Sequence, residues 1–362
     1  MRTGPTPETA APLAAARADA PPLRRSLRGG LWGLGLAVLV LSVSVAVSVG
    51  AVAIPLGTVW GVVLDRVAPG VITPDWSAGR ANIVWEIRLP RALLAALVGA
   101  GLALVGAVLQ SVTRNPLADP HLLGISSGAA FGAILALLHT GLFLGAVTVP
   151  LLAFVGALCS TLLVLAVASF AQATSADRLV LTGVAVSFIV MALANTLIFL
   201  GDPRAAHTVV FWMLGGLGLA QWGHLIWPAA ILLGAALWFR LVAGSLNAMT
   251  IGDETAATLG IPVARFRLTC FVVAALVTGV MVAFSGVIGF VGLMIPHIVR
   301  LVVGGDNARV LPASMLAGAV FLIWADIAAR TLMRPEDMPI GIVTGLVGGA
   351  FFIWLLRRRL RG

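Results

Sequence analysis

About ten long runs of apolar residues, separated by short polar segments, dominate this sequence. A helix needs about 20 apolar residues to cross the hydrocarbon core of a bilayer, so runs of this length predict membrane spans. The chain is 60% hydrophobic and 10% charged, a balance that excludes an ordinary soluble domain. We therefore expect an all-α polytopic membrane protein with about ten transmembrane helices, at residues 31–53, 92–110, 126–144, 147–170, 179–200, 223–243, 268–287, 288–304, 311–331 and 340–356.

The two ends of the chain differ from its apolar centre. Residues 1–30 are rich in Ala, Pro and Arg and show no helical or strand period, which predicts a disordered cytoplasmic tail. The pair Arg24-Arg25 before the first run is typical of an export signal, but this run is too long for a signal core, so an uncleaved first span is favoured. We expect a transmembrane domain at 31–356 and a basic cytoplasmic tail at 357–362.

All 23 basic residues are arginine, and their distribution orients the predicted spans. If the N-terminus is cytoplasmic, 16 arginines fall on cytoplasmic segments and 7 on the opposite side. Cytoplasmic loops carry an excess of basic residues, so both termini are predicted to be cytoplasmic, with an even number of spans. The net charge of +9 therefore reflects orientation in the membrane and does not indicate nucleic-acid binding. Because the chain has no lysine, it lacks the phosphate-binding lysine of a Walker A loop, and ATP with Mg²⁺ would have to act on a separate subunit.

Two patterns bear on how the spans are arranged. The apolar sequence at 268–304 is continuous but too long for one crossing, so we divide it at Ser285-Gly286. Several small residues and prolines recur at an offset of 180 positions, among them Gly106 with Gly286. Composition explains part of such matching. If the repeat is real, its copies begin five spans apart and are inverted, a common plan among transporters.

The most distinctive stretch covers residues 88–132. It opens with the sequence RLPR, continues as a glycine-rich span and ends in a proline-broken turn, NPLADPHLLGISSGA, before the next span. Prolines so close together cannot continue a helix, so the stretch is a span, a structured loop containing Pro116, and a second span. Two later segments stand beside it, ETAATLG at 254–260 and GFVGLMIPHIVR at 289–300.

Together these segments resemble the FecCD family of ABC-importer permeases over roughly residues 80–356. The resemblance implies a multi-pass subunit of the inner (cytoplasmic) membrane that carries ferric siderophores, haem or cobalamin. It implies three partners besides the lipid bilayer: an ATP-binding cassette subunit, an extracytoplasmic substrate-binding protein, and a second permease copy or paralogue. No cofactor is expected in the chain itself.

Three arginines, Arg88, Arg91 and Arg330, fall at predicted outer ends of spans. Charges there are costly unless they reach the interface or a partner, and Asp326 lies four residues before Arg330 on the same helix face. The residues alone favour interfacial anchors or an internal ion pair. The resemblance instead implies a platform for acidic residues of the binding protein, a task suited to bidentate guanidinium groups.

The longest polar cytoplasmic segment, about 244–267, predicts one short helix. Asp253 and Glu254 suit a helix N-terminus, where the helix dipole favours acids. Gly260 and then Pro262 end the helix after about two turns. On these residues alone the segment could be a plain surface turn.

The resemblance implies that this short helix is the coupling helix, which sits in a groove of the ATPase subunit. Small Ala256 and Ala257 would permit close seating, and Leu259 would supply an apolar contact. An isolated helix of this length is marginal in water, which also favours packing on a partner.

Pro296 and His297 lie inside a predicted span. Pro296 frees backbone groups that neighbouring helices have to satisfy. A lone intramembrane histidine beside a proline more often bonds backbone or an adjacent loop than a ligand, and the same holds for His121. No cluster of His, Cys, Asp and Glu has the spacing of a metal site in the sequence, so no metal is expected.

In similar permeases, two copies meet along the fifth and tenth spans, and the cargo passes between them. The resemblance therefore nominates residues 180–200, including Met191, Asn195 and Thr196, and the glycine-rich segment 341–349 as the pathway.

The family's inner gates map to the loop after the second span and the loop before the fifth. They nominate Asn115, Leu117, Ala176 and Asp177. The last two stand where the cobalamin permease has small hydroxyl residues, so the gate of this chain differs from that one. The outer segment 202–224 is rich in aromatic residues and glycine, which predicts interfacial anchoring or a short re-entrant helix.

We therefore predict the permease subunit of an ABC importer, moved by a separate ATPase through alternating access. Ferric siderophores are the favoured cargo because they are the commonest in the family, and haem and cobalamin are the alternatives. An ion-coupled secondary transporter would need paired ionisable residues within spans, for which Asp326 is the one real candidate in the sequence. An intramembrane enzyme is disfavoured because no nucleophile–base or metal constellation appears.

Overall fold

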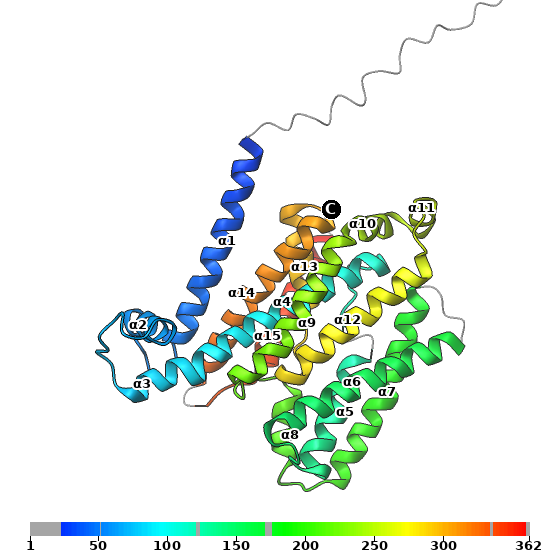
Figure 1. Cartoon of the computed structure of the whole chain (residues 1–362). Helices are drawn as coiled ribbons and strands as arrows, with labels where there is room; N and C mark the ends of the chain where they lie inside the picture. Colours follow the sequence, from blue (N-terminus) through cyan, green and yellow to red (C-terminus); the bar gives the residue numbers. More distant parts are fainter. Residues whose placement is uncertain (1–22, 51, 121–123, 171–175, 334–335, 360–362) are drawn as a thin grey trace, which may run out of the picture.

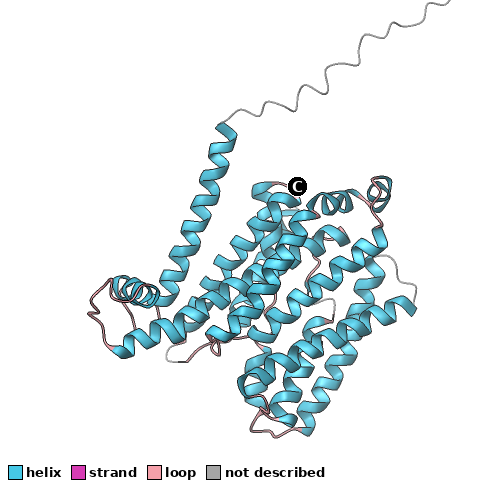
Figure 2. Cartoon of the chain, in the orientation of Figure 1, coloured by secondary structure: helices cyan, strands magenta, loops and turns pink. Residues whose placement is uncertain are grey.

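The computed structural model describes residues 23–50, 52–120, 124–170, 176–333 and 336–359. These ranges form helices joined by loops and contain no strand (Figure 2), which confirms the all-α prediction. The principal helices are α1 (Leu23–Ser48), α2 (Leu56–Val67), α3 (Ala78–Asn82), α4 (Leu89–Thr113), α5 (Ile125–Leu135), α6 (Thr148–Phe170), α7 (Ala176–Leu200), α8 (Ala206–Met213), α9 (Trp222–Leu241), α10 (Ala243–Ile251), α11 (Asp253–Thr258), α12 (Val263–Ser285), α13 (Val291–Val303), α14 (Asn307–Thr331) and α15 (Ile340–Arg359).

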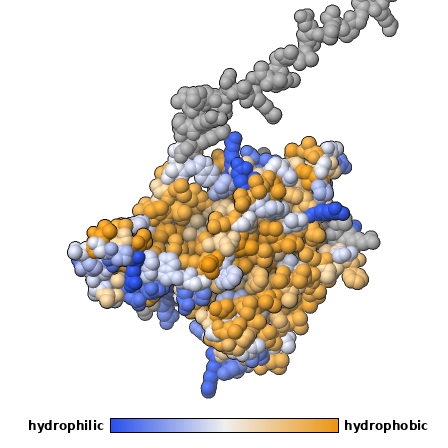
Figure 3. Space-filling model, viewed as in Figure 1, coloured by the Kyte–Doolittle hydropathy of each residue, from blue (hydrophilic) through white to orange (hydrophobic). Residues whose placement is uncertain are grey.

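Seven of the described helices are long and apolar enough to cross a membrane. Three shorter apolar helices accompany them, at Ile125–Thr140, Val291–Val303 and Ile340–Leu355. Each of the apolar runs read from the sequence overlaps one of these helices. The bundle presents a broad apolar surface (Figure 3), and the prediction of a polytopic membrane protein is confirmed.

Both ends of the described chain lie on the same side of the helix bundle (Figure 1). α1 begins and α15 ends on this side, where α10 and α11 also lie, whereas α2 and α3 lie on the opposite side. We call these two sides the α11 face and the α2 face.

The helix α4 is the buried centre of the bundle, packed against α9, α12, α13 and α14. Its residues 98–113 are all buried. A methyl group on Gly99 would overlap the carbonyl of Gly318 in α14. A methyl group on Gly106 would overlap the carbonyl of Gly292 in α13. Lipid tails are as apolar as these helices, so close van der Waals packing of this kind has to hold them together.

The helices α5, α6 and α7 form a second group that packs on the same principle. A methyl group on Gly128 of α5 would overlap the carbonyl of Gly156 in α6. One turn further along α5, a methyl group on Gly132 would overlap the carbonyl of Leu152. The helix α12 contacts both α4 and α6 and so joins the two groups.

The continuous apolar sequence at 268–304 is divided where the prediction placed the break. α12 ends at Ser285, and Gly286 follows with a φ of +66°, a left-handed conformation that glycine adopts without strain. α13 begins at Val291. Gly106, the proposed repeat partner of Gly286, lies instead in the middle of α4, so this pair does not occupy equivalent positions.

The polar segment at 244–267 contains two short helices before α12 begins at Val263, whereas one was predicted. The residues before α11 form α10. Its Leu246 and Met249 are three positions apart, so they lie on one face of the helix, and both are fully buried. Two apolar residues are too short a pattern to indicate a helix in sequence. The segment 202–224 also forms a short helix, α8.

We expect the substitution Gly106→Ala to destabilise the fold, because its methyl group would overlap the Gly292 carbonyl. Overpacking of this kind costs about 1–3 kcal/mol, which should lower the thermal unfolding temperature of the detergent-solubilised protein by several degrees. Gly234→Ala in α9 is the matched control, since nothing lies within 4 Å of its added methyl group and alanine favours a helix. Equal unfolding temperatures for the two variants would contradict the packing assigned to α4.

Candidate functional site

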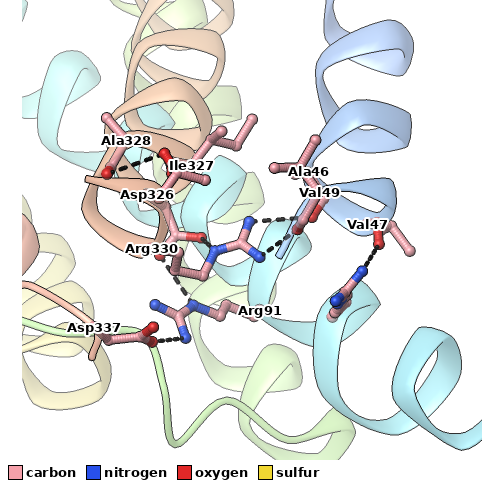
Figure 4. Close-up of polar contacts among 11 residues, drawn as sticks. Ala46, Val47, Val49, Arg91, Asp326, Ile327, Ala328, Arg330 and Asp337 are labelled. Carbon is pink, nitrogen blue, oxygen red and sulfur yellow. Dashed lines mark hydrogen bonds and ion pairs between the residues drawn. The ribbon is translucent and has the colours of Figure 1, made fainter. Parts of the chain in front are cut away.

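The C-terminal end of α1, at the α2 face, is capped by two arginines from other parts of the chain (Figure 4). The last carbonyl groups of a helix have no partner within it. Nη1 of Arg88 donates to the carbonyl oxygens of Val47 and Ser48, both at 2.9 Å. Nη1 of Arg330 donates to the carbonyl oxygen of Val49 at 3.0 Å. Both arginine side chains are buried, with exposed fractions of 7% and 8%.

A buried carboxylate, Asp326, links the Arg330 cap to the surface. It is 1% exposed and accepts a hydrogen bond from Nε of Arg330 at 2.9 Å and from Nε of Arg91 at 3.0 Å. Nη1 of Arg91 also donates to Asp337 at 2.6 Å. Asp337 is 42% exposed, so the network runs from the interior to the α2 face (Figure 4).

The predicted docking arginines are therefore not equivalent. The internal pair between Asp326 and Arg330 that their spacing indicated is confirmed. Arg88 and Arg330 are directed at α1, and Arg91 is the member of the trio that contacts an exposed carboxylate. Sequence reasoning missed Asp337, because 246 positions separate it from Arg91 and no local pattern links them.

At the α11 face, Asp253 fixes α11 to the ends of two long helices. Its carboxylate accepts two hydrogen bonds from Nη2 of Arg267 in α12, at 2.7 and 2.8 Å. Nη2 of Arg114 lies 3.7 Å from the same carboxylate. Arg114 directly follows α4 and has a left-handed φ of +54°. α11 is therefore attached to the start of α12 and to the end of α4.

The predicted coupling residues divide between the inside and the outside of the molecule. Ala256 is fully buried within the chain, so it does not offer the outer contact expected of it. Ala257 is exposed, and Leu259 is exposed to 67%. Ile251, at 72%, adds a second exposed apolar side chain that sequence reasoning missed.

The ends of α11 follow the prediction. Asp253 and Glu254 occupy its first turn. The N–H of Gly260 donates to the carbonyl of Ala257 at 2.9 Å, and the N–H of Ile261 donates to that of Ala256 at 3.0 Å. This pair of bonds is a Schellman motif, which needs the left-handed φ of +81° that Gly260 adopts.

A polar clamp that the sequence did not indicate holds α10 against α14. Nδ2 of Asn247 donates to Asp306 at 2.9 Å, while Oδ1 of Asn247 accepts from the N–H of Asn307 at 2.8 Å and from its Nδ2 at 2.9 Å. Oδ1 of Asn307 in turn accepts from Ser111 of α4 at 2.9 Å. Nη2 of Arg300 in α13 donates to the Ser111 hydroxyl at 2.9 Å. The clamp therefore connects α10 with α14, α4 and α13.

Pro296 interrupts the hydrogen bonds of α13, as predicted. It has no N–H to give to the carbonyl of Gly292, four residues earlier. Nε2 of Gln110 in α4 donates to that carbonyl at 3.3 Å and to the carbonyl of Leu293 at 3.1 Å. A neighbouring helix thus satisfies the freed groups, which confirms the expectation for this proline.

The aromatic ring of Phe351 lies beside His297, with the ring centroids 6.1 Å apart. Within the described ranges, no three or more His, Cys, Asp or Glu side chains come close enough together to hold a metal ion. His121 lies outside the described residues.

The predicted gate loop after α4 is ordered by its own side chain. Oδ1 of Asn115 accepts a hydrogen bond from the N–H of Leu117 at 2.9 Å, across Pro116. Leu117 is 51% exposed. Ala176 and Asp177 begin α7, but their side chains lie outside the described part of the chain.

The predicted pathway residues of α7 differ in how far they are exposed. Met191 is half-buried and packs with Ala130, Ile134 and neighbouring apolar residues. Asn195 and Thr196 are exposed. The Thr196 hydroxyl donates to the carbonyl of Ala192 at 3.0 Å, which lowers its cost against lipid. The exposed Asn195 side chain is costly against lipid, so its side of α7 is suited to a contact with protein or water.

Comparisons with known proteins agree with this architecture. A model of the FecCD transport family matches residues 38–358. The hemin transport system permease protein of Yersinia pestis is 38% identical over 298 residues, which cover 78% of this chain and 87% of that protein. The vitamin B12 import system permease protein of Salmonella paratyphi A is 40% identical over 296 residues, which cover 82% of this chain and 89% of that protein.

A solved inward-facing structure of a metal-chelate type ABC transporter has a TM-score of 0.76 and 30% identity, and the match covers 91% of this chain and 99% of that chain. The family match includes the central bundle and both candidate faces. The chain belongs to the FecCD transport family and is the permease subunit of an ABC importer.

Proposed function

We propose that this permease imports metal chelates, with ferric siderophores as the favoured cargo and haem or cobalamin as the alternatives. The observation that carries the proposal is the family match over residues 38–358, whose named relatives transport hemin, vitamin B12 and metal chelates. Hemin and vitamin B12 are both metal complexes of a large organic ring, so a bulky metal chelate is the chemistry these relatives share. The choice of siderophore rests on its frequency in the family.

In this proposal two permease copies, or this chain and a paralogue, meet along α7 and α15 in the cytoplasmic membrane. The exposed Asn195 and Thr196 support the contact on α7, and α15 adds Leu346 at 70% exposure and Val347 at 44%. The ATP-binding subunit would bind at the α11 face and the substrate-binding protein at the α2 face. Cargo would pass between the two permeases.

The cargo can be tested in proteoliposomes that contain the permease, its ATP-binding subunit and its binding protein. We expect ATP-dependent accumulation of a radiolabelled ferric siderophore that exceeds accumulation of haem and cobalamin. ADP in place of ATP is the control. Selective accumulation of haem or cobalamin would replace the siderophore assignment, and accumulation that needs an ion gradient but no ATP would refute the proposed importer.

The exposed apolar side chains beside and on α11 are the proposed contact with the ATP-binding subunit. We expect Ala257→Arg to reduce co-purification of that subunit by about tenfold or more, since a buried unpaired charge costs several kcal/mol. Ala78→Arg, at an exposed position that begins α3 at the α2 face, is the matched control. The expectation fails if both variants retain the ATP-binding subunit equally.

Arg91 and Asp337 are the proposed docking point for an acidic residue of the binding protein. Nη1 of Arg91 already donates to Asp337, so an incoming carboxylate would have to replace Asp337 at that nitrogen. We expect Asp337→Asn to strengthen binding of the substrate-binding protein, by up to about fivefold for an ion pair near the surface. Asp75→Asn removes the same charge from the connection between α2 and α3 and serves as the control.

Surface plasmon resonance at two salt concentrations would measure the affinity of the Asp337→Asn and Asp75→Asn variants for the substrate-binding protein. Higher affinity for the substrate-binding protein in Asp337→Asn but not in Asp75→Asn supports the replacement of Asp337 at Arg91 by a carboxylate of that protein. Equal affinities in the two variants would contradict the docking role proposed for Arg91. The charge-reversed Arg88 and Arg330 variants are unsuitable for this purpose, because they would also uncap α1.

A further inference from the structure

A groove opens between α1 and α14 on the side of the α11 face. The two helices are in contact nearer the α2 face and diverge toward the α11 face (Figure 1). The groove has a volume of about 1000 Å³. Its walls are largely apolar, with Trp32, Leu34 and Val38 from α1 and Leu316 and Val320 from α14. We call it the α1 groove.

The α1 groove has a cationic end. Arg240, at the end of α9, and Arg309, in the first turn of α14, both line it, and both are exposed. Among the described residues, the carboxylate of Asp306 interacts with both arginines, and it lies 3.6 Å from Nε of Arg309. That carboxylate already accepts hydrogen bonds from Asn247 at 2.9 Å and from the N–H of Ala308 at 3.0 Å. The two guanidinium groups therefore face one carboxylate, which also has other hydrogen-bond partners. Two positive charges against one negative charge leave this end of the groove positive.

The hydrogen bond from Asn247 is the strongest of the interactions that lower the pKa of Asp306, and the nearby arginines lower it further. The carboxylate thus stays ionised at neutral pH and cancels only one of the two positive charges. An occupant of the groove has to combine an anionic group with a long apolar part.

We infer that the α1 groove binds one anionic phospholipid, with its phosphate at Arg240 and Arg309 and an acyl chain between α1 and α14. Basic pockets between membrane helices are typical sites for anionic headgroups. Trp32, which lines the groove and is 41% exposed, belongs to the residue type that gathers at headgroup level. The lipid would fill the space between two helices that pack directly only over part of their length.

Residues 1–22 match the groove less well than a phospholipid does. They are rich in alanine and proline and contain one leucine, so they offer no run of large apolar side chains for the walls. They also carry two arginines against two acidic residues, which gives them no net negative charge for Arg240 and Arg309. A lipid supplies both of the required parts and is present wherever this chain is inserted.

Native mass spectrometry of the full chain, released from nanodiscs, would test the inference. The nanodiscs would contain phosphatidylglycerol and phosphatidylcholine with identical acyl chains in equal amounts. We expect one phosphatidylglycerol to be retained in preference to phosphatidylcholine. In the double variant Arg240→Gln/Arg309→Gln that preference should fall by roughly tenfold.

The double variant Arg66→Gln/Arg80→Gln is the matched control, because it removes the same charge from exposed positions in α2 and α3. Equal retention of the two lipids by the wild-type chain would overturn the inference. A preference that survives in Arg240→Gln/Arg309→Gln, or is lost equally in the control, would also overturn it. Unfolding temperatures in phosphatidylcholine alone check that both variants are folded.

A photo-reactive amino acid in place of Val38 would identify the occupant directly. Val38 lines the groove and is 39% exposed. Cross-linking to phospholipid, reduced in the Arg240→Gln/Arg309→Gln background, supports the inference. Cross-linking to residues 1–22 or to another protein would overturn it.

Discussion

Direct contact between helix backbones around α4 is the constraint on which the rest of the fold depends. Gly106 meets Gly292 with no side chain between them, and Gly99 meets Gly318 in the same way. Apolar helices gain little by leaving lipid for one another, so dispersion at these short separations has to supply the association. Because of these contacts most of α4 is buried, and the helix runs from the α2 face to the side of α11. α4, which lies in the most buried of the seven long apolar segments described, thus joins the α2 face and the α11 face.

Many of the buried polar groups serve the ends and interruptions of helices. Gln110 satisfies carbonyls that Pro296 leaves without a partner, and Arg88 and Arg330 satisfy those at the end of α1. An intramembrane ionisable residue is often taken as a sign of ion coupling. Here Asp326 holds two arginines at the end of the bundle, which gives it a structural reason to be buried.

The sequence allowed correct prediction of features that depend on neighbouring residues. These include the helical runs, the break after Ser285 and the pair of Asp326 with Arg330. The sequence did not allow prediction of contacts between distant segments, such as Arg91 with Asp337 or the clamp at Asn247. Such contacts leave no periodic pattern in the neighbouring residues. The expectation that Ala256 faces outward differs from the structure for a related reason, since a helix of six residues is too short for its buried side to be read from periodicity.

The capping of α1 has a consequence for how this chain is made. α1 precedes the other described helices in the chain, and its last carbonyl groups have no hydrogen-bond donors within the helix. Arg88 arrives early, about 40 residues later, whereas Arg330 follows its partner Val49 by 281 positions. In an insertion intermediate that contains α1 to α4, Arg88 alone of these two arginines can therefore cap α1, and the contact with Arg330 forms only after α14 has been made.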